Sequence, residues 1–164
     1  MSTSKKQAEF ITAVQEAAEQ PLRQDVLLSL VGYNCRRAYL NIQSMFVERM
    51  EPFGLRTVDF TVLSLLKANP NITQKRLAQA IDVSPPNVAI LLDRLEERGL
   101  LVRQRNPLDK RSQTLVLTAE GTRLCAKAEV MVSALERDAT SALTAHEREQ
   151  LLALLQKIFL SSSE

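Results

Sequence analysis

The stretch of sequence that decides the fold is residues 71–121, NITQKRLAQAIDVSPPNVAILLDRLEERGLLVRQRNPLDKRSQTLVLTAEG. Thr73 precedes a short helical pattern, and Ser84 and Pro85 precede a longer one that ends at Gly99. Threonine and serine are good N-caps, proline is well tolerated at the first helical position, and glycine favours a helix end. The stretch therefore predicts two helices joined by a tight turn.

The second of these helices, over residues 84–98, has one apolar face and one mixed face. Helical spacing turns four apolar side chains inward, namely Val88, Leu91, Leu92 and Leu95. The flanks and the outer face carry Asn87, Ala89, Ile90, Asp93 and Arg94. A helix of this length after a short helix and a turn is the arrangement that places a recognition helix in the major groove of DNA. Two packed helices with no further role are the simpler alternative.

Two short strand patterns, 100–102 and 114–117, follow this helix and flank a basic loop. Residues 103–111 carry four cations and one acid, although the net charge of the chain is only +2. Such a local concentration of positive charge is the electrostatic footprint of a nucleic-acid binder. The order of two helices and a basic hairpin predicts a winged helix-turn-helix, with a solvated charged turn as the alternative interpretation of the hairpin.

The candidate DNA contacts differ in what they offer. The Asn87 amide can hydrogen-bond a base edge, Ala89 and Ile90 can meet a thymine methyl group, and Arg94 suits a phosphate or a base. At the hairpin tip, Arg111 or Lys110 can enter the minor groove, while Asp109 either orients Arg111 or caps the loop. The full candidate set is Thr73, Gln74, Lys75, Arg76, Ser84, Pro85, Pro86, Asn87, Ala89, Ile90, Arg94, Arg105, Asp109, Lys110 and Arg111.

Composition limits the remaining classes of protein. The 164 residues are 45% hydrophobic and 4% aromatic, which favours a mostly α protein with a small β hairpin. The only histidine, His146, lies in a capping sequence, so an enzyme is not expected, and neither a metal nor a cofactor is. The chain has no long uncharged apolar run, which predicts a cytoplasmic protein without a membrane partner.

Helical patterns outside the central stretch point to dimerisation. We expect one long helix over 22–50, a second over 57–67, a third from Thr118 to about Ala139, and a last one that begins with a capping box at Thr144 and Glu147. These helices hold more apolar surface than a small lobe can cover. The predicted division is a flexible arm (1–21), a dimerisation helix (22–56), the DNA-binding lobe (57–117) and C-terminal dimerisation helices (118–164). A monomer whose terminal helices wrap its own core is the alternative.

Four polar residues on the first long helix form a candidate ligand site. Asn34 and Asn41 lie seven residues apart within the apolar stripe, and Tyr33 and Arg37 lie on the same side. Polar groups on a buried face need partners, so they either bond across a dimer or line a ligand cleft. In a cleft, the Arg37 guanidinium suits a carboxylate.

Cys35 and Cys125 both fall within expected helices. A buried cysteine usually acts as a small apolar residue. A redox-sensing regulator is the less favoured alternative, because sensing needs a lowered thiol pKa. A helical adaptor that uses the winged domain for protein contacts is a further alternative to DNA binding.

Over about residues 22–160 the chain resembles the MarR family of transcriptional regulators. The resemblance rests on VSPPNV (83–88), LDRLEERGL (92–100), DKRS (109–112) and LTAEG (117–121). It implies a homodimer that binds a pseudo-palindromic site in double-stranded DNA, usually as a repressor, and that is released by a small-molecule effector such as an aromatic acid. It also implies a ligand cleft at Tyr33, Asn34, Arg37 and Asn41. Many relatives carry Thr and Arg where this helix has Ala89 and Ile90.

Overall fold

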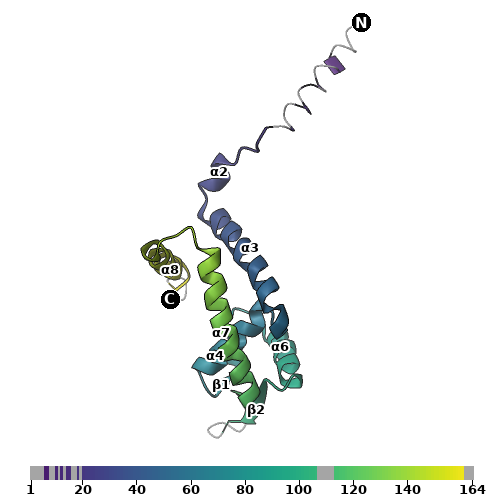
Figure 1. Ribbon diagram of the computed structural model, residues 1–164. Coiled ribbons are helices and arrows are strands. Elements are labelled where there is room, and N and C mark those ends of the chain that lie inside the picture. The colour runs from purple at the N-terminus through teal and green to yellow at the C-terminus, as the bar shows by residue number, and fades with distance from the viewer. Residues whose placement is uncertain are drawn as a thin grey trace. The chain divides into compact units, whose positions relative to one another are not determined.

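The computed structural model describes residues 6, 7, 10, 12, 14, 15, 18, 20–106 and 113–160. The chain divides into two compact units, Met1–Tyr39 and Leu40–Glu164. The second unit contains the entire central stretch. Its described elements are mainly helical with a small sheet, as predicted (Figure 1).

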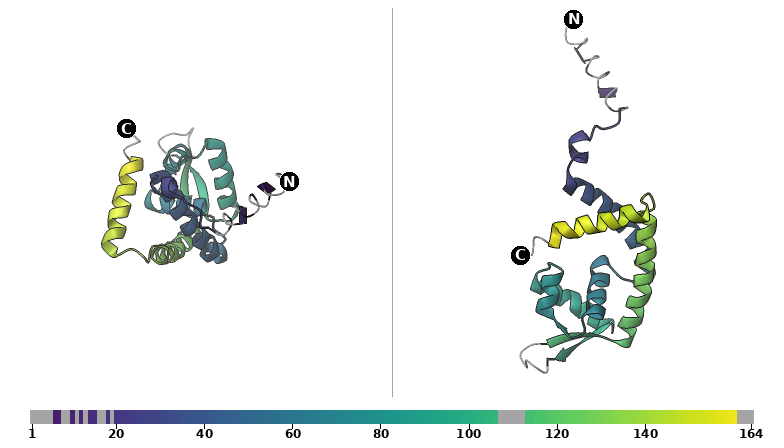
Figure 2. Two further views of the ribbon diagram at one scale, coloured as in Figure 1. Left: turned by 90° about the horizontal axis from the view of Figure 1, so that it is seen from above. Right: turned by 90° about the vertical axis from the view of Figure 1, so that its left-hand side faces the viewer.

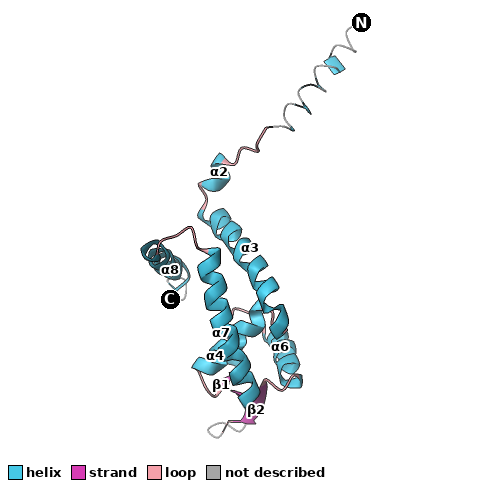
Figure 3. Cartoon of the chain, in the orientation of Figure 1, coloured by secondary structure: helices cyan, strands magenta, loops and turns pink. Residues whose placement is uncertain are grey.

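The predicted helices and strands follow one another in the predicted order. They carry the labels of Figure 1, and Figure 3 colours them as helices and strands. They are α2 (Asp25–Leu28), α3 (Val31–Met50), a 3-10 turn η1 (Glu51–Phe53), α4 (Thr57–Ala68), β1 (Ile72–Thr73), α5 (Gln74–Ala80), α6 (Pro85–Glu97), β2 (Leu101–Arg105), β3 (Gln113–Leu117), α7 (Ala119–Ala139) and α8 (Ala145–Leu160).

The sheet is antiparallel with the strand order β1-β3-β2. Ile72 of β1 and Arg103 of β2 both pair with Leu115, at the centre of β3. The predicted hairpin is therefore confirmed, and a third strand is added to it. β1 was not predicted from the sequence, because two residues are too few to show the alternation of apolar and polar residues that marks a strand.

A hydrophobic core joins the end of α3 and the helices α4, α5, α6 and α7 to the sheet, whereas α8 contributes no buried residue to it. All four inward side chains predicted for α6 are buried, and they belong to the same core as buried leucines of α4, α5 and β2. The members from α6 are Val88, Leu91, Leu92 and Leu95, and the leucines are Leu63, Leu77 and Leu101. The sheet lies at the same end of the second unit as the start of α7 (Figure 2). The apolar periodicity of α6 thus determined its inner face.

Three of the predicted helix starts are capped by side chains. The Thr73 hydroxyl accepts a hydrogen bond from Arg76 N over 3.4 Å, and the Thr118 hydroxyl accepts one from Gly121 N over 3.0 Å. At α8, Thr144 and Glu147 form the predicted capping box. The predicted start of α6 is confirmed, with Ser84 at the N-cap position and Pro85 as the first helical residue, but the Ser84 side chain makes no capping hydrogen bond. Pro86 at the second helical position has no N–H to donate.

The long helix expected over residues 22–50 is divided in the structure, which corrects that prediction. α2 ends at Leu28 and α3 begins at Val31. The Asn34 side-chain amide donates to the backbone carbonyls of Leu28 and Leu30, over 2.9 and 2.8 Å. It thereby satisfies the Leu28 carbonyl at the break, while the Leu30 carbonyl also accepts a hydrogen bond from Asn34 N over 3.1 Å. Apolar periodicity continues across the break, which is why the sequence pattern did not reveal it.

The start of α7 lies directly against the residues that link α6 to β2. Thr118 N donates to the Leu100 carbonyl over 3.1 Å, and the Thr118 hydroxyl donates to the Gly99 carbonyl over 2.7 Å. A Cβ atom placed on Gly121 would lie 1.9 Å from the Leu100 carbonyl oxygen. Only glycine allows α7 to approach the backbone this closely.

Replacing Gly121 with alanine is expected to destabilise the protein by about 2 kcal/mol, because the new methyl group must push a buried backbone carbonyl aside. Urea unfolding followed by circular dichroism measures the effect. The matched control is Gly32→Ala in α3, where nothing lies within 4 Å of the new Cβ. The control should keep or raise stability, by up to about 1 kcal/mol. Equal stability of both variants would contradict the close contact.

The two cysteines differ in exposure. Cys125 is fully buried between α7 and α4, as a structural cysteine should be, whereas Cys35 on α3 is exposed in the single chain. Burial is the main cause of the raised pKa of the Cys125 thiol. A raised pKa keeps the thiol protonated near neutral pH and lowers its reactivity.

In a Cys35→Ser variant, the remaining Cys125 is expected to react with a thiol reagent such as DTNB only after denaturation. The thiol reacts as the thiolate, and burial opposes both ionisation and access. The rate with and without urea, followed by absorbance, measures the protection. Rapid reaction of the native variant would favour the redox-sensing alternative.

Candidate nucleic-acid interface

α5, the turn and α6 form the helix-turn-helix frame. Within the turn, Asp82 has a positive φ of 50°, and Val83 N donates to the Ala78 carbonyl over 3.2 Å. Aspartate tolerates this left-handed backbone better than most residues. With Ala78 and Val88 buried on either side, the turn directs the start of α6 away from the core.

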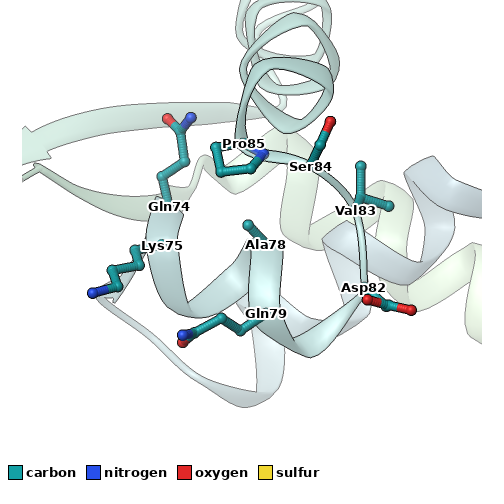
Figure 4. Close-up of a pocket in the computed structure, with 8 residues that line it drawn as sticks. All are labelled: Gln74, Lys75, Ala78, Gln79, Asp82, Val83, Ser84 and Pro85. Carbon is teal, nitrogen blue, oxygen red and sulfur yellow. The ribbon is translucent and has the colours of Figure 1, made fainter.

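A hollow of about 670 Å³ lies between α5 and the turn (Figure 4). Gln74, Lys75 and Gln79 extend from α5 along it, and Asp82 points outward at the far end of the turn. The remaining lining residues are Ala78, Val83, Ser84 and Pro85. The hollow is thus lined mainly by polar side chains of α5 and by small or apolar side chains of the turn and the start of α6.

The outer face of α6 is exposed and uncharged over its first two turns. Pro86, Asn87 and Ile90 are exposed, Ile90 by 69%, and Ala89 is half-buried. Pro85 and Pro86 have no backbone N–H, so the start of α6 offers fewer donors to a phosphate than most helix N-termini. This face is therefore suited to base edges and methyl groups rather than to phosphates.

Arg94 was predicted to contact DNA, but its side chain is engaged within the protein. Its guanidinium forms an ion pair with Asp59 of α4, a carboxylate that is fully buried. Asp59 also accepts a hydrogen bond from Arg56 N over 2.9 Å. Because the Arg94 charge is used to neutralise a buried carboxylate, we omit Arg94 from the proposed DNA surface.

Three further charged residues at the C-terminal end of α6 also have partners within the protein, while Glu97 is exposed. Arg98 donates to the carbonyls of Gly54 and Phe53 over 2.7 and 3.1 Å. Asp93 and Glu96 both bind Arg103 of β2. Both arginines at this end of the helix are thus occupied, and α6 presents no unpaired cation outward.

The exposed cations of this surface come from the elements on either side of α6. Lys75 and Arg76 are exposed on α5, and Arg105 is exposed at the end of β2. Thr73 and Gln74 are half-buried at the start of α5. The predicted wing-tip residues Asp109, Lys110 and Arg111 lie outside the described residues. Positive charge therefore lies on the elements before and after α6, whose first two turns present an uncharged outer face.

The four candidate ligand residues lie on α3. Tyr33 donates its hydroxyl hydrogen to Gln24 over 2.6 Å, and Asn34 bonds the backbone at the α2–α3 break. Arg37 and Asn41 are exposed in the single chain. Asn34 and Asn41 are thus not on a buried face within one chain, and Asn34 already has local partners.

The sequence carries a signal for Asp59, although the predicted site residues do not include it. Asp59, Val62, Leu63 and Leu66 have the spacing of one helical face, which places a carboxylate in an apolar stripe. All four are buried. A carboxylate in such a position needs a cationic partner, and Arg94 and Arg56 supply it. In contrast, no pattern in the sequence distinguished Arg103 from the other basic residues of the hairpin.

The part of the chain that the structure describes also bears on two other kinds of site. No group of three or more histidine, cysteine or acidic side chains there is arranged to hold a metal ion. Among the described helices, none combines the length and the apolar composition needed to cross a membrane.

Comparisons with known proteins agree with this geometry. The sequence profile of the MarR family matches residues 53–112. The transcriptional repressor CouR bound to a 23-mer DNA duplex is 37% identical with a TM-score of 0.80, covering 85% of this chain and 99% of that chain. CouR bound to p-coumaroyl-CoA is 36% identical with a TM-score of 0.74, covering 84% and 97%.

A relative from Thauera aromatica is 29% identical over 135 residues, which are 82% of this chain and 81% of that protein. It is described as a putative transcriptional regulatory protein for the hcr operon. The likeness to CouR extends beyond the helix-turn-helix over most of both chains. The chain therefore belongs to the MarR family of winged-helix transcriptional regulators.

Proposed function

We propose that this protein is a homodimeric repressor that binds a pseudo-palindromic operator and is released by a small aromatic effector. The observation that carries the proposal is the exposed, uncharged outer face of α6 with cations on both sides of it. The likeness to a repressor bound to a DNA duplex supports it. The part from 57 to 117 would act as the DNA-binding lobe.

The proposed contacts divide into two groups. Lys75, Arg76 and Arg105 would bind phosphates, and such contacts position a protein without reading sequence. Asn87 and Ile90 would read bases, the amide on an adenine edge and the isoleucine on a thymine methyl group. Supporting contacts are proposed for Thr73, Gln74, Ser84, Pro85, Pro86 and Ala89, and, outside the described residues, for Asp109, Lys110 and Arg111.

Dimerisation is proposed through the segments 22–56 and 118–164. In the first unit, Leu22, Val26 and Leu28 are exposed apolar residues. In the second unit, α8 exposes Leu152 and Leu154. Exposed apolar surface of this extent on single chains usually marks an interface. A two-fold dimer would also match the symmetry of a palindromic site.

The proposed effector is an aromatic acid or its coenzyme A thioester. The aromatic acid is proposed from the resemblance of the sequence to the MarR family. The thioester is proposed from the likeness to CouR bound to p-coumaroyl-CoA. Arg37 is exposed on α3 and offers a guanidinium to a carboxylate or a phosphate. To convert nearly complete binding into nearly complete release, the effector must prefer the released conformation by about 5 kcal/mol.

The first test is DNA binding itself. The purified protein should retain genomic fragments that share an inverted repeat, and fluorescence anisotropy on one such fragment measures affinity against salt. Arg76→Ala should weaken binding to all sequences and lower the salt slope by about one, because one phosphate contact is lost. Asn87→Ala should instead relax preference at one base position, by about tenfold.

Glu97→Gln, at the exposed end of α6, is the control for general effects of substitution and should leave the sequence preference unchanged. If the wild-type protein binds no DNA fragment even at low salt, the proposed repressor is wrong and a protein-binding adaptor is favoured.

The second test is release from the operator. We expect p-coumaroyl-CoA or a related aromatic thioester, or the free aromatic acid, to dissociate the complex, and coenzyme A alone to leave it intact. Arg37→Ala should keep DNA affinity and lose release, because the substitution removes the charge that holds the effector. Arg36→Ala is the matched control on the adjacent position of α3 and should respond like the wild type. Equal loss in both variants would contradict a specific role of Arg37.

A further inference from the structure

Arg103 of β2 links the hairpin to the recognition helix by three hydrogen bonds. Its Nη2 donates to Asp93 over 2.6 Å, its Nη1 donates to Glu96, and its backbone N donates to the other oxygen of the Glu96 carboxylate over 3.0 Å. Asp93 and Glu96 lie three residues apart on α6, so one guanidinium joins two carboxylates of the same helix face. Charge-assisted bonds of this kind fix orientation as well as distance.

The side chain of Arg103 is placed for this role rather than for contact with DNA. It is 18% exposed, whereas Asp93 is 60% exposed. Two carboxylates neutralise its charge, and both terminal nitrogens of its guanidinium are occupied. Arg103 therefore has little charge to offer a phosphate.

Arg105 lies two residues further along the same strand and is exposed. Residues two apart on a strand share one face, so Arg103 and Arg105 lie on the same side of β2. Arg105 pairs with Gln113 at the last described position of the ladder, where fewer strand bonds restrain it. The bonds from Arg103 to α6 are thus the contacts nearest to Arg105 that hold this part of β2 in a fixed position relative to the recognition helix.

We propose that Arg103 is a positioning residue that sets the place of Arg105 relative to α6, so that Arg105 meets the DNA backbone beside the groove that α6 enters. The inference rests on the proposed DNA binding. It assigns to Arg103 no contact of its own with DNA. Without the Arg103 side chain, the two carboxylates on α6 repel each other, and only the backbone N–H of residue 103 still links β2 to Glu96.

A double-mutant cycle on DNA binding tests the proposal, with affinity measured over a range of salt concentrations on one operator fragment. Arg105→Ala should lower the salt slope by about one, because one phosphate contact is lost. Arg103→Ala should lower the slope by about the same amount, and the double variant should lose little more than either single variant. Additive losses would overturn the proposal, because they would mean that the two arginines act independently.

A second variant approaches the link from α6 and distinguishes positioning from simple neutralisation of charge. Asp93→Ala with Glu96→Ala removes two negative charges near the DNA, so electrostatics alone predicts tighter binding. A positioning role predicts the opposite result: the salt dependence of DNA affinity should have a lower slope, and Arg105→Ala should have a smaller effect when it is added to the Asp93→Ala, Glu96→Ala variant. Tighter binding, or an unchanged effect of Arg105→Ala, would overturn the proposal.

The outcomes for the two proposals remain distinguishable. If the wild-type protein binds its operator and Arg105→Ala binds equally well, the positioning role and the phosphate contact of Arg105 both fail, while the proposed repressor function stands. If the wild-type protein binds no DNA, the proposed function fails and the inference with it. Arg103→Lys keeps the charge and should recover part of the coupling, because one ammonium group can bind one of the two carboxylates.

Discussion

The buried carboxylate of Asp59 must be neutralised, and this requirement shapes the DNA-facing side of the protein. An uncompensated charge in a protein interior costs several kcal/mol, so a cation has to stay beside it. Arg94 supplies that charge from α6, and Arg56 adds a backbone hydrogen bond from the start of α4. The recognition helix is thereby bound to α4 by a charge pair as well as by its apolar face.

This use of Arg94 has a consequence for DNA recognition. With Arg98 bound to backbone carbonyls and Arg103 bound to two carboxylates, the cations at the C-terminal end of α6, and both Asp93 and Glu96, are engaged within the protein. What remains exposed toward a partner is short and uncharged, mainly Asn87 and Ile90. In the proposed function, affinity therefore comes from the cations on α5 and β2, and α6 contributes selectivity through an amide and apolar contacts.

The proposed effector response depends on residues of α3 that are held in different ways. Tyr33 and Asn34 already bond Gln24 and the carbonyls beside the α2–α3 break, so they stabilise the entry into α3. An effector that engages them has to replace these bonds, and only a difference in its affinity for two conformations can alter DNA binding. Arg37 and Asn41 are exposed and can meet a ligand without first giving up such bonds.

Local signals in the sequence were sufficient for the helix starts at Thr73 and Thr118 and for the apolar face of α6, because caps and helical periodicity involve residues within a few positions of each other. They were also sufficient for the strand pair and the MarR family. Only the tertiary structure decided that Arg94 binds Asp59, 35 positions away, and that Arg103 binds α6 rather than facing solvent. A long charged side chain can reach many partners, so its choice depends on which groups folding brings within hydrogen-bond distance and which of them are buried.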